Sequence, residues 1–365
     1  MTSLRDRDDI VRRRLRAQRL IGKPFAKPGE VVAWHLAMQS QDYAGAKWAV
    51  GQRCAHASDR SVEAAVAGGE ILRTHVLRPT WHFVAPADVR WLLQLTAPRI
   101  SAQSAPYFRR HGLDAQALRR SRRVLEKQLA DRRLTREQLA PALAAAGLPT
   151  AGEALSYQLL AAELAGVIVS GGRSGKHHLY ALLDQIVPAA AKKPRDEALA
   201  ELALRYLQGH GPALVQDLAW WAGLTIADAK RGVAAAGPAL QSAVVDERHY
   251  WFAGPARGVL LREPAVHLLP NYDEQLIAYR YRGNAVDAAT SARVGRGDGI
   301  FDGHFLLIDG KLVGSYRREQ SKTRALLTVT HLRALTRAEQ RALRVQAERH
   351  AAFLELELEL SLQRR

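Results

Sequence analysis

Three times along the first 255 residues, a group of short helix patterns is followed by two strand patterns around a turn. The strand pairs are "ILRTHVLRPTWHFV" (71–84), "VIVSGGRSGKHHLYALL" (167–183) and "ALQSAVVDERHYWFA" (239–253). Runs rich in β-branched and aromatic residues around a turn are typical of a β-hairpin. Helices followed by a hairpin predict three tandem winged helix-turn-helix units, which repeat in architecture rather than in sequence.

The helices expected before each strand pair have recognisable boundaries. Thr135 and Thr225 are typical N-cap residues for helices of the second and third units. In the first unit, a basic helix carrying Ile10, Leu15 and Leu20 is expected to precede helices at 28–38, 44–51 and 61–68.

From about residue 262 the patterns become strand-like, at 265–283, 304–319 and 324–332, with a hairpin turn at Asp309-Gly310. A closing helix with Thr336 as its N-cap is expected over 336–361. The predicted fold is mainly α with β-hairpin wings, in which tandem winged helix-turn-helix units precede a C-terminal antiparallel β-barrel-like domain. The predicted domains are 1–108, 109–190, 191–260 and 261–365.

Basic residues dominate the charge of the 365-residue chain, whose 53 Lys and Arg outnumber its 36 Asp and Glu to give a net charge of +17. Such an excess favours a polyanionic partner, although the codon usage of a GC-rich genome is an alternative source. Nine arginines lie between positions 109 and 136, a density that favours contact with DNA phosphates. The predicted DNA-binding residues are Arg109, Arg110, Arg119, Arg120, Arg122, Arg123, Arg173, Lys176 and His177.

Several other classes of site are not expected. Cys54 is the only cysteine, so no disulfide framework or paired-cysteine metal site is expected. The stretch "SGGRSGK" (170–176) falls in a predicted hairpin, which is the wrong context for a phosphate-binding loop. Neighbouring His177 and His178 point to opposite faces of a strand, and we predict neither a metal nor a cofactor. The chain shows no secretory signal and no membrane-spanning run, which predicts a cytoplasmic protein.

The stretch "MQSQDYAGAKWAV" (38–50) places two glutamines one residue apart. Residues two apart diverge on a helix but share a face in an extended segment. If the helix has ended and Asp42 caps the next one, the amides of Gln39 and Gln41 converge and can hold one water molecule between them. Ordinary hydrogen bonding at a helix end remains the alternative interpretation.

The first hairpin offers polar neighbours for this pair. Strict alternation would place Arg78, Thr80 and His82 on one face and apolar residues on the other. We expect these three side chains to face solvent or a cleft and to support the site together with Asp42. A surface histidine without a function is the alternative for His82.

Four segments, in this order, resemble those of the AlkZ-like (AlkZ/YcaQ) winged-helix DNA glycosylases. They are "HLAMQSQDYAGAKWAVGQR" (35–53), "LRPTWHFVAPADVRWLL" (77–93), "LLPNYDEQLIAYRYR" (268–282) and "LIDGKLVGSYRR" (307–318). The resemblance implies winged helices around a concave DNA-binding face, and a catalytic pair at Gln39 and Gln41. Ser40 departs from the usual apolar residue between the glutamines, and Tyr316 replaces the usual Trp.

The resemblance also implies hydrolysis of the N-glycosidic bond of N7-alkylated purines, including bulky adducts and interstrand crosslinks. We therefore predict a monofunctional glycosylase that acts, as a monomer without a membrane partner, on alkylation-damaged double-stranded DNA in the nucleoid. The alternative is a non-catalytic winged-helix DNA-binding protein, either a regulator or a nucleoid factor. Such a regulator usually binds as a symmetric dimer and reads bases.

Overall fold

The structure, a computed structural model, describes residues 4–254, 259–294 and 303–364. The first part of the chain contains the expected helices and the first hairpin, β2–β3. The helix predicted over 28–38 is shorter than expected, because it ends at His35 and a short strand follows. The elements are α1 (Arg7–Ala17), α2 (Pro28–His35), β1 (Ala37–Gln39), α3 (Tyr43–Gly51), α4 (Asp59–Ala67), β2 (Leu72–His75) and β3 (Trp81–Val84).

A long helix, α5 (Pro86–Arg110), leads into the second part, so the boundary predicted after residue 108 falls within its last turn. Thr135 caps its helix as predicted, by accepting a hydrogen bond from the N–H of Gln138. The second hairpin is β5–β6. The elements after α5 are α6 (Ala115–Leu129), β4 (Leu134–Thr135), α7 (Arg136–Ala145), α8 (Ala154–Leu164), β5 (Ile168–Ser174), β6 (His177–Leu182) and α9 (Leu183–Ile186).

The first two hairpins belong to one six-stranded sheet, with the strand order β1-β3-β2-β5-β6-β4. The link between them is the pairing of Arg73 with Ser170. The sequence predicted two separate wings, but this shared sheet places the second hairpin alongside β2 of the first, with β3 and β1 beyond it.

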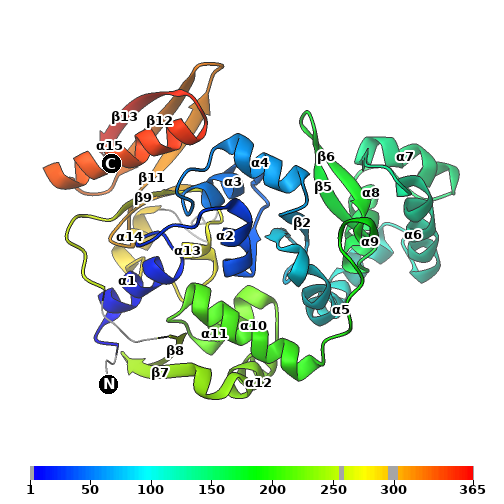
Figure 1. Cartoon of the computed structure of the whole chain (residues 1–365), viewed down its shortest axis with the longest axis horizontal. Coiled ribbons are helices and arrows are strands. Elements are labelled where there is room, and N and C mark those ends of the chain that lie inside the picture. Colours follow the sequence, from blue (N-terminus) through cyan, green and yellow to red (C-terminus); the bar gives the residue numbers. More distant parts are fainter. Residues whose placement is uncertain (1–3, 255–258, 295–302, 365) are drawn as a thin grey trace.

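The third part lies beside α1 and α2 (Figure 1). Its Thr225 is an N-cap as predicted, with its side chain accepting from the N–H of Asp228. The elements are α10 (Arg195–His210), α11 (Val215–Ala222), α12 (Ile226–Ala236), the 3-10 helix η1 (Gly237–Ala239), β7 (Leu240–Val245) and β8 (Arg248–Ala253).

The C-terminal part is an open five-stranded sheet with the order β13-β12-β11-β10-β9, and β13 runs parallel to β12. The predicted antiparallel pairing holds from β9 to β12, whereas β13 adds a parallel pair and the described strands do not close into a barrel. The expected turn at Asp309-Gly310 joins β10 to β11, and Thr336 caps α15. The elements are β9 (Val266–Leu269), α13 (Glu274–Ile277), α14 (Ala288–Val294), β10 (His304–Ile308), β11 (Lys311–Gln320), β12 (Arg324–His331), α15 (Arg337–Phe353) and β13 (Glu357–Arg364).

Two further predictions for this part are wrong. The closing helix ends at Phe353, and "ELELEL" (355–360) enters β13, because its strict alternation suits a strand with one buried face. The strand expected over 265–283 ends at Leu269. Asp273 then caps the short helix α13 by accepting from the N–H of Gln275 at 2.9 Å.

Buried contacts join the C-terminal part to the first. The Phe353 side chain packs on Trp48, and a Cβ at Gly51 would lie 2.3 Å from the Phe353 ring. Arg53 and Asp273 form a fully buried bidentate ion pair with two N–O distances of 2.9 Å. These contacts hold the start of α13 against the end of α3, close to the predicted glutamine pair.

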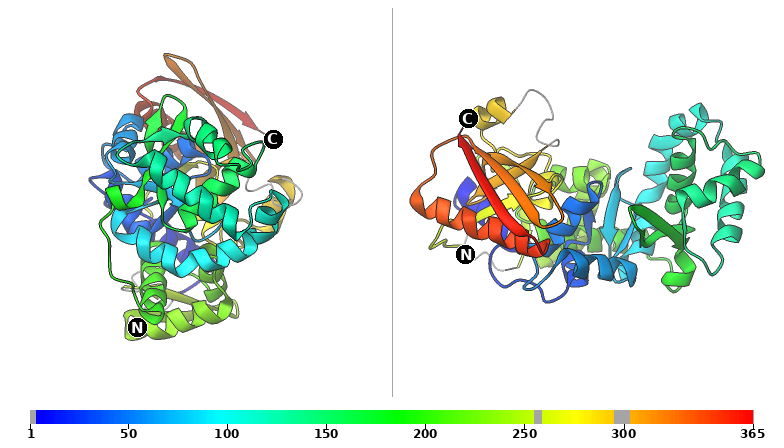
Figure 2. Two further views of the ribbon diagram at one scale, coloured as in Figure 1. Left: turned by 90° about the vertical axis from the view of Figure 1, so that its right-hand side faces the viewer. Right: turned by 90° about the horizontal axis from the view of Figure 1, so that it is seen from above.

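The two ends of the long axis lie far apart in Figure 1 and in the right-hand view of Figure 2. The C-terminal sheet and α15 form one end, α6 and α7 form the other, and α2, α3 and α10 lie between them. None of the described helices combines the length and the apolar character needed to cross a bilayer.

Candidate functional site

The segment Gln39–Gln41 is extended. The chain leaves α2 through Leu36, whose φ of 67° turns the backbone away from the helix. In β1, Gln39 pairs with His82 of β3, and the N–H of Ser40 donates to the Trp81 carbonyl at 2.7 Å. β1 ends at Gln39, and Gln41 lies in the bend that leads into α3. The Gln41 N–H lies 3.4 Å from Gln39 Oε1.

The two glutamines differ in burial. Gln39 is 6% exposed, whereas Gln41 is open to solvent. As predicted, Asp42 caps the next helix, by accepting from the N–H of Gly45 at 3.0 Å. Its carboxylate also pairs with Arg318 of β11 at 3.0 Å. A Cβ at Gly45 would lie 2.3 Å from the Asp42 carboxylate, so this turn requires glycine.

A buried carboxylate holds the backbone of Gln39. Glu274, the first residue of α13, is 1% exposed, and its Oε1 accepts from the Gln39 N–H at 2.9 Å. Its Oε2 accepts from the Trp221 indole N–H at 2.8 Å and lies 3.5 Å from His210 Nε2. Elements from three distant parts of the sequence therefore meet at one carboxylate beside the glutamine pair.

The turn of the first hairpin differs from the predicted alternation, since β3 begins only at Trp81. Arg78 and Thr80 both lie in the turn, where the Arg78 N–H donates to the Val76 carbonyl and the Thr80 N–H to the Arg78 carbonyl, each at 2.7 Å. Both side chains are partly exposed.

The expectation that His82 faces solvent or a cleft is wrong, because it is 0% exposed. It lies in the middle strand, between Gln39 and Thr74 in the cross-strand register, so its neighbours cover it. Burial lowers the pKa of His82 well below its usual range. The ring is therefore neutral at pH 7, and Nδ1 lies 2.9 Å from the Thr80 carbonyl oxygen, so Nδ1 carries the proton and donates.

The second hairpin reaches the glutamine segment through Arg173. The Arg173 guanidinium lies 5.0 Å from the centre of the Tyr43 ring and 3.6 Å from the Glu63 carboxylate. Lys176 and His177 are exposed near the tip of the hairpin. A cleft of about 410 Å³ lies beside Ala44, and Arg173 and Arg318 both line it.

The sequence model of the DNA glycosylase AlkZ-like family matches residues 32–353. This chain belongs to the AlkZ-like DNA glycosylase family. In solved structures, the chain is similar to Streptomyces sahachiroi DNA glycosylase AlkZ, with 20% identity and a TM-score of 0.82 over 99% of this chain and 100% of that one. No curated protein sequence matches it.

In this AlkZ-like chain, the arginine-rich stretch lies away from the glutamine pair. Arg109 and Arg110 end α5, and the other arginines of this stretch predicted to bind DNA lie on α6, at the end of the molecule opposite the C-terminal sheet (Figure 1). Most are exposed, but Arg122 is half-buried and its Nε lies 3.3 Å from the Leu118 carbonyl oxygen. The α6 residues are Arg119, Arg120, Arg122 and Arg123.

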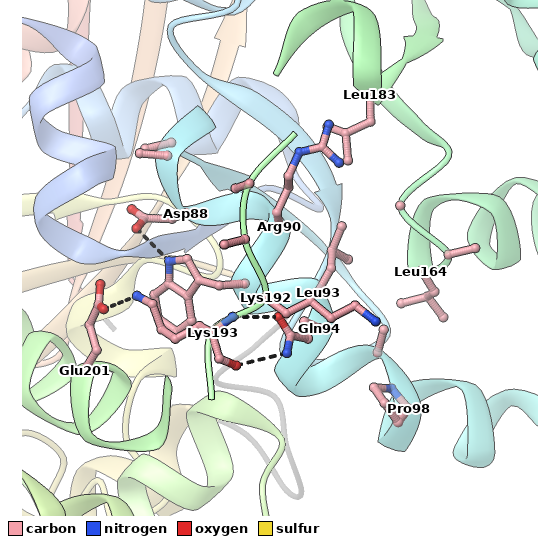
Figure 3. Close-up of a pocket in the computed structure, with 18 of the residues that line it drawn as sticks. Asp88, Arg90, Leu93, Gln94, Pro98, Leu164, Leu183, Lys192, Lys193 and Glu201 are labelled. Carbon is pink, nitrogen blue, oxygen red and sulfur yellow. Dashed lines mark hydrogen bonds and ion pairs between the residues drawn. The ribbon is translucent and has the colours of Figure 1, made fainter. Parts of the chain in front are cut away.

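A cavity of about 960 Å³ lies between α5 and the segment before α10. Figure 3 shows Asp88, Arg90 and Gln94 of α5 on one side of it, with Lys193 and Glu201 nearby. None of the predicted site residues lines this cavity. Across the described ranges, no group of three or more His, Cys, Asp or Glu side chains is placed to hold a metal ion.

Sequence reasoning missed Glu274, Trp221 and His210. The AlkZ-like segment "LLPNYDEQLIAYRYR" contains Glu274, but its apolar and aromatic residues suggested a strand with no role beyond the C-terminal domain. A buried carboxylate can be detected only from its partners, and these lie more than 50 positions away in the sequence.

Proposed function

We propose that this protein is a DNA glycosylase that hydrolyses the N-glycosidic bond of N7-alkylated purines in double-stranded DNA, using water positioned by Gln39 and Gln41. Its family supports the class of reaction. The observation that best supports the proposal is that the Gln41 N–H lies 3.4 Å from Gln39 Oε1, at a point where α2 has ended, with Gln39 held in β1 and Gln41 exposed.

The chemistry of the lesion explains why amides suffice. An N7-alkylated guanine carries a positive charge and leaves the sugar as a neutral base. A general acid, which commonly contributes about 10²–10⁴ in rate, is therefore unnecessary. What remains is a sugar with oxocarbenium character and a water that must capture it. Two uncharged amides offer the carbonyl acceptors and N–H donors that orient such a water.

The ionisable neighbours are less suited to the step. Both oxygens of Glu274 already accept N–H groups within a buried setting. His82 is neutral and buried, so it has no proton to give as an imidazolium. The two glutamines therefore remain the groups in a position to hold the attacking water.

The proposal extends to bulky adducts and interstrand crosslinks. A crosslinked base cannot be swung out of the duplex into a closed pocket, as most enzymes that act on bases require. Gln41 is exposed at the surface, and an accessible amide of this kind suits a base that stays stacked. We propose that the protein acts as a monomer on damaged chromosomal DNA in the cytoplasm, without a cofactor.

The test is base release from duplex DNA carrying N7-methylguanine or a nitrogen-mustard crosslink, detected by alkaline cleavage at abasic sites. Gln39→Ala and Gln41→Ala should each lower the rate about 10²–10³-fold, because each removes a preorganised polar contact at the transition state. The two losses should not add, since both amides hold the same water. DNA affinity should be unchanged, because no charge is lost.

Gln94→Ala is the matched control, since it removes an exposed amide on α5 away from the pair. It should release base at the wild-type rate. A Gln39→Ala, Gln41→Ala variant with wild-type base release would overturn the proposal. Absence of base release by the wild type, together with a strong consensus in random-site selection, would favour a regulator instead.

A further inference from the structure

We propose that Arg78, held by the turn of the first hairpin against Trp220, binds a backbone phosphate of the DNA beside the nucleotide that is cleaved. The inference rests on the proposed function only in taking DNA as the ligand. It assigns a role to a cation that the water-positioning chemistry does not use.

Arg78 has no hydrogen-bond acceptor or counter-ion for its side chain among the described residues. Its Nε and Nη2 atoms are buried, and within the described part of the chain they have no hydrogen-bond acceptor. Burial lowers the pKa of Arg78, while the carboxylate of Glu274 raises it from beyond hydrogen-bonding distance. Leaving buried guanidinium N–H groups unsatisfied costs free energy. Nη1 is not among these enclosed atoms, and a phosphodiester oxygen is a strong, charge-assisted acceptor for it.

The turn that carries Arg78 is held rigidly. The hydrogen bond from Arg78 N–H to Val76 O closes a three-residue turn around Leu77, whose φ is 65°. Such a turn is rare and strained for a residue with a side chain. Strain of this kind persists only where the surroundings impose it, and it is common at functional sites.

Three contacts impose this conformation. The Leu77 N–H donates to Thr96 Oγ1 of α5 at 3.2 Å, and His82 Nδ1 donates to the carbonyl of Thr80. On the other side, the Leu77 carbonyl oxygen approaches Gly223 so closely that a Cβ there would lie 2.0 Å from it. The position of Arg78 is therefore set by α5, β3 and the end of α11.

Trp220 provides the surface next to Arg78. Its indole is 40% exposed, and the Arg78 guanidinium carbon lies 5.8 Å from the ring centre. The Trp220 N–H donates to the carbonyl of Ile277 at 3.3 Å. Ile277 is the last residue of α13, and the first residue, Glu274, holds Gln39. One short helix therefore connects the Arg78–Trp220 pair to the glutamine site.

Thr80 lies at the same turn, but its Oγ1 is buried and has no partner among the described residues, so it is not a second donor to a phosphate. Arginine by itself is a donor type that commonly contacts DNA phosphates. A phosphate bound there would fix the register of the strand while its base lies towards Gln39 and Gln41.

The experiment measures binding to undamaged duplex DNA as a function of salt, so it does not depend on base release. Arg78→Met keeps the apolar stem of the side chain and removes the charge. It should weaken binding for every sequence and make the salt dependence of log K less steep by about 0.9, the value for one phosphate contact. Arg78→Lys should restore the slope.

Arg231→Met is the matched control, because Arg231 is an exposed arginine of α12 that already pairs with Asp196. Arg231→Met should leave the salt dependence of log K close to the wild-type value. Urea unfolding of all three variants separates loss of contact from loss of fold.

A scan with single methylphosphonates, which remove the charge of one phosphate at a time, locates the contact on a duplex with one N7-methylguanine. Replacing the phosphate that Arg78 binds should weaken DNA binding by the wild type but not by Arg78→Met. That phosphate should lie within about two nucleotides of the lesion. Equal salt slopes for the wild type and a folded Arg78→Met variant would overturn the proposal. The proposal would also be overturned if the loss of affinity from Arg78→Met simply added to the loss from a methylphosphonate at every position. Neither result would affect the proposed glycosylase chemistry.

Discussion

Replacing Glu274 by Gln separates two roles that a buried carboxylate beside Gln39 could have. If Glu274 only positions Gln39, an amide of the same shape should serve. The amide oxygen can still accept the hydrogen bond from the Gln39 N–H, which in the wild type lies 2.9 Å from Glu274 Oε1. Its NH₂ group can face His210 Nε2, which is an acceptor because His210 Nδ1 lies against the Tyr206 carbonyl oxygen at 3.2 Å.

The exchange of Glu274 for Gln removes the hydrogen-bond acceptor of Trp221. Its indole N–H, which now donates to Glu274 Oε2 at 2.8 Å, would face an NH₂ group instead. A buried donor left without an acceptor costs about 1–3 kcal/mol. We therefore expect Glu274→Gln to lower the free energy of unfolding by about that amount, and to release base within about threefold of the wild-type rate, since less than 0.7 kcal/mol of barrier would change.

Glu274→Ala should behave differently, because it leaves both the Gln39 and the Trp221 N–H groups without an acceptor. Its stability should fall by about 2–6 kcal/mol, and any folded fraction should have the base-release defect of Gln39→Ala. The assays are urea unfolding and base release under single-turnover conditions. Adding Trp221→Phe should cost less stability in Glu274→Gln than in the wild type, because the donor has already lost its partner.

Two results would refute the positioning role. The first is a Glu274→Gln variant as stable as the wild type, which would mean that the contact with Trp221 contributes no stability. The second is a stable Glu274→Gln variant that releases base as slowly as Gln39→Ala. The negative charge itself would then act in the reaction, and Glu274 would belong to the chemistry rather than to its support.

Three further predictions follow from buried and basic groups. Asp273→Asn should lower the free energy of unfolding by about 3–5 kcal/mol because it leaves the Arg53 guanidinium buried without a counter-ion; adding Arg53→Met should recover part of that loss in urea unfolding. Burial lowers the pKa of His267 to about 4 and of His350 to about 3. Their contribution to stability should be complete above about pH 6.5 and should fall as the pH drops towards 4, because the unfolded chain binds these protons first; a urea midpoint that rises on acidification would contradict this. Lys176→Ala should weaken binding to undamaged duplex at low salt without changing the urea midpoint. Unchanged affinity would show that the tip of the second hairpin does not contact DNA.

The local features of the chain could be predicted from the sequence. Thr135, Thr225 and Asp42 each cap a helix as expected, because a cap is a contact between residues three positions apart. The helix before Gln39 has also ended, which is the condition that their spacing set for the two amides to converge. The resemblance in four ordered motifs was sufficient to indicate the family, which the match over residues 32–353 confirmed.

Only the tertiary structure decided which groups surround the glutamine pair. Glu274 reaches Gln39 from 235 positions away, and no local pattern records that distance. His82 was expected near the surface, but pairing on both sides of its strand buries it. The alternating stretch 355–360 entered β13 instead of continuing α15, because β12 offered an edge for it to pair with. Spacing along the chain determines contacts within a turn or two, whereas burial and ion pairing depend on which distant surfaces pack together.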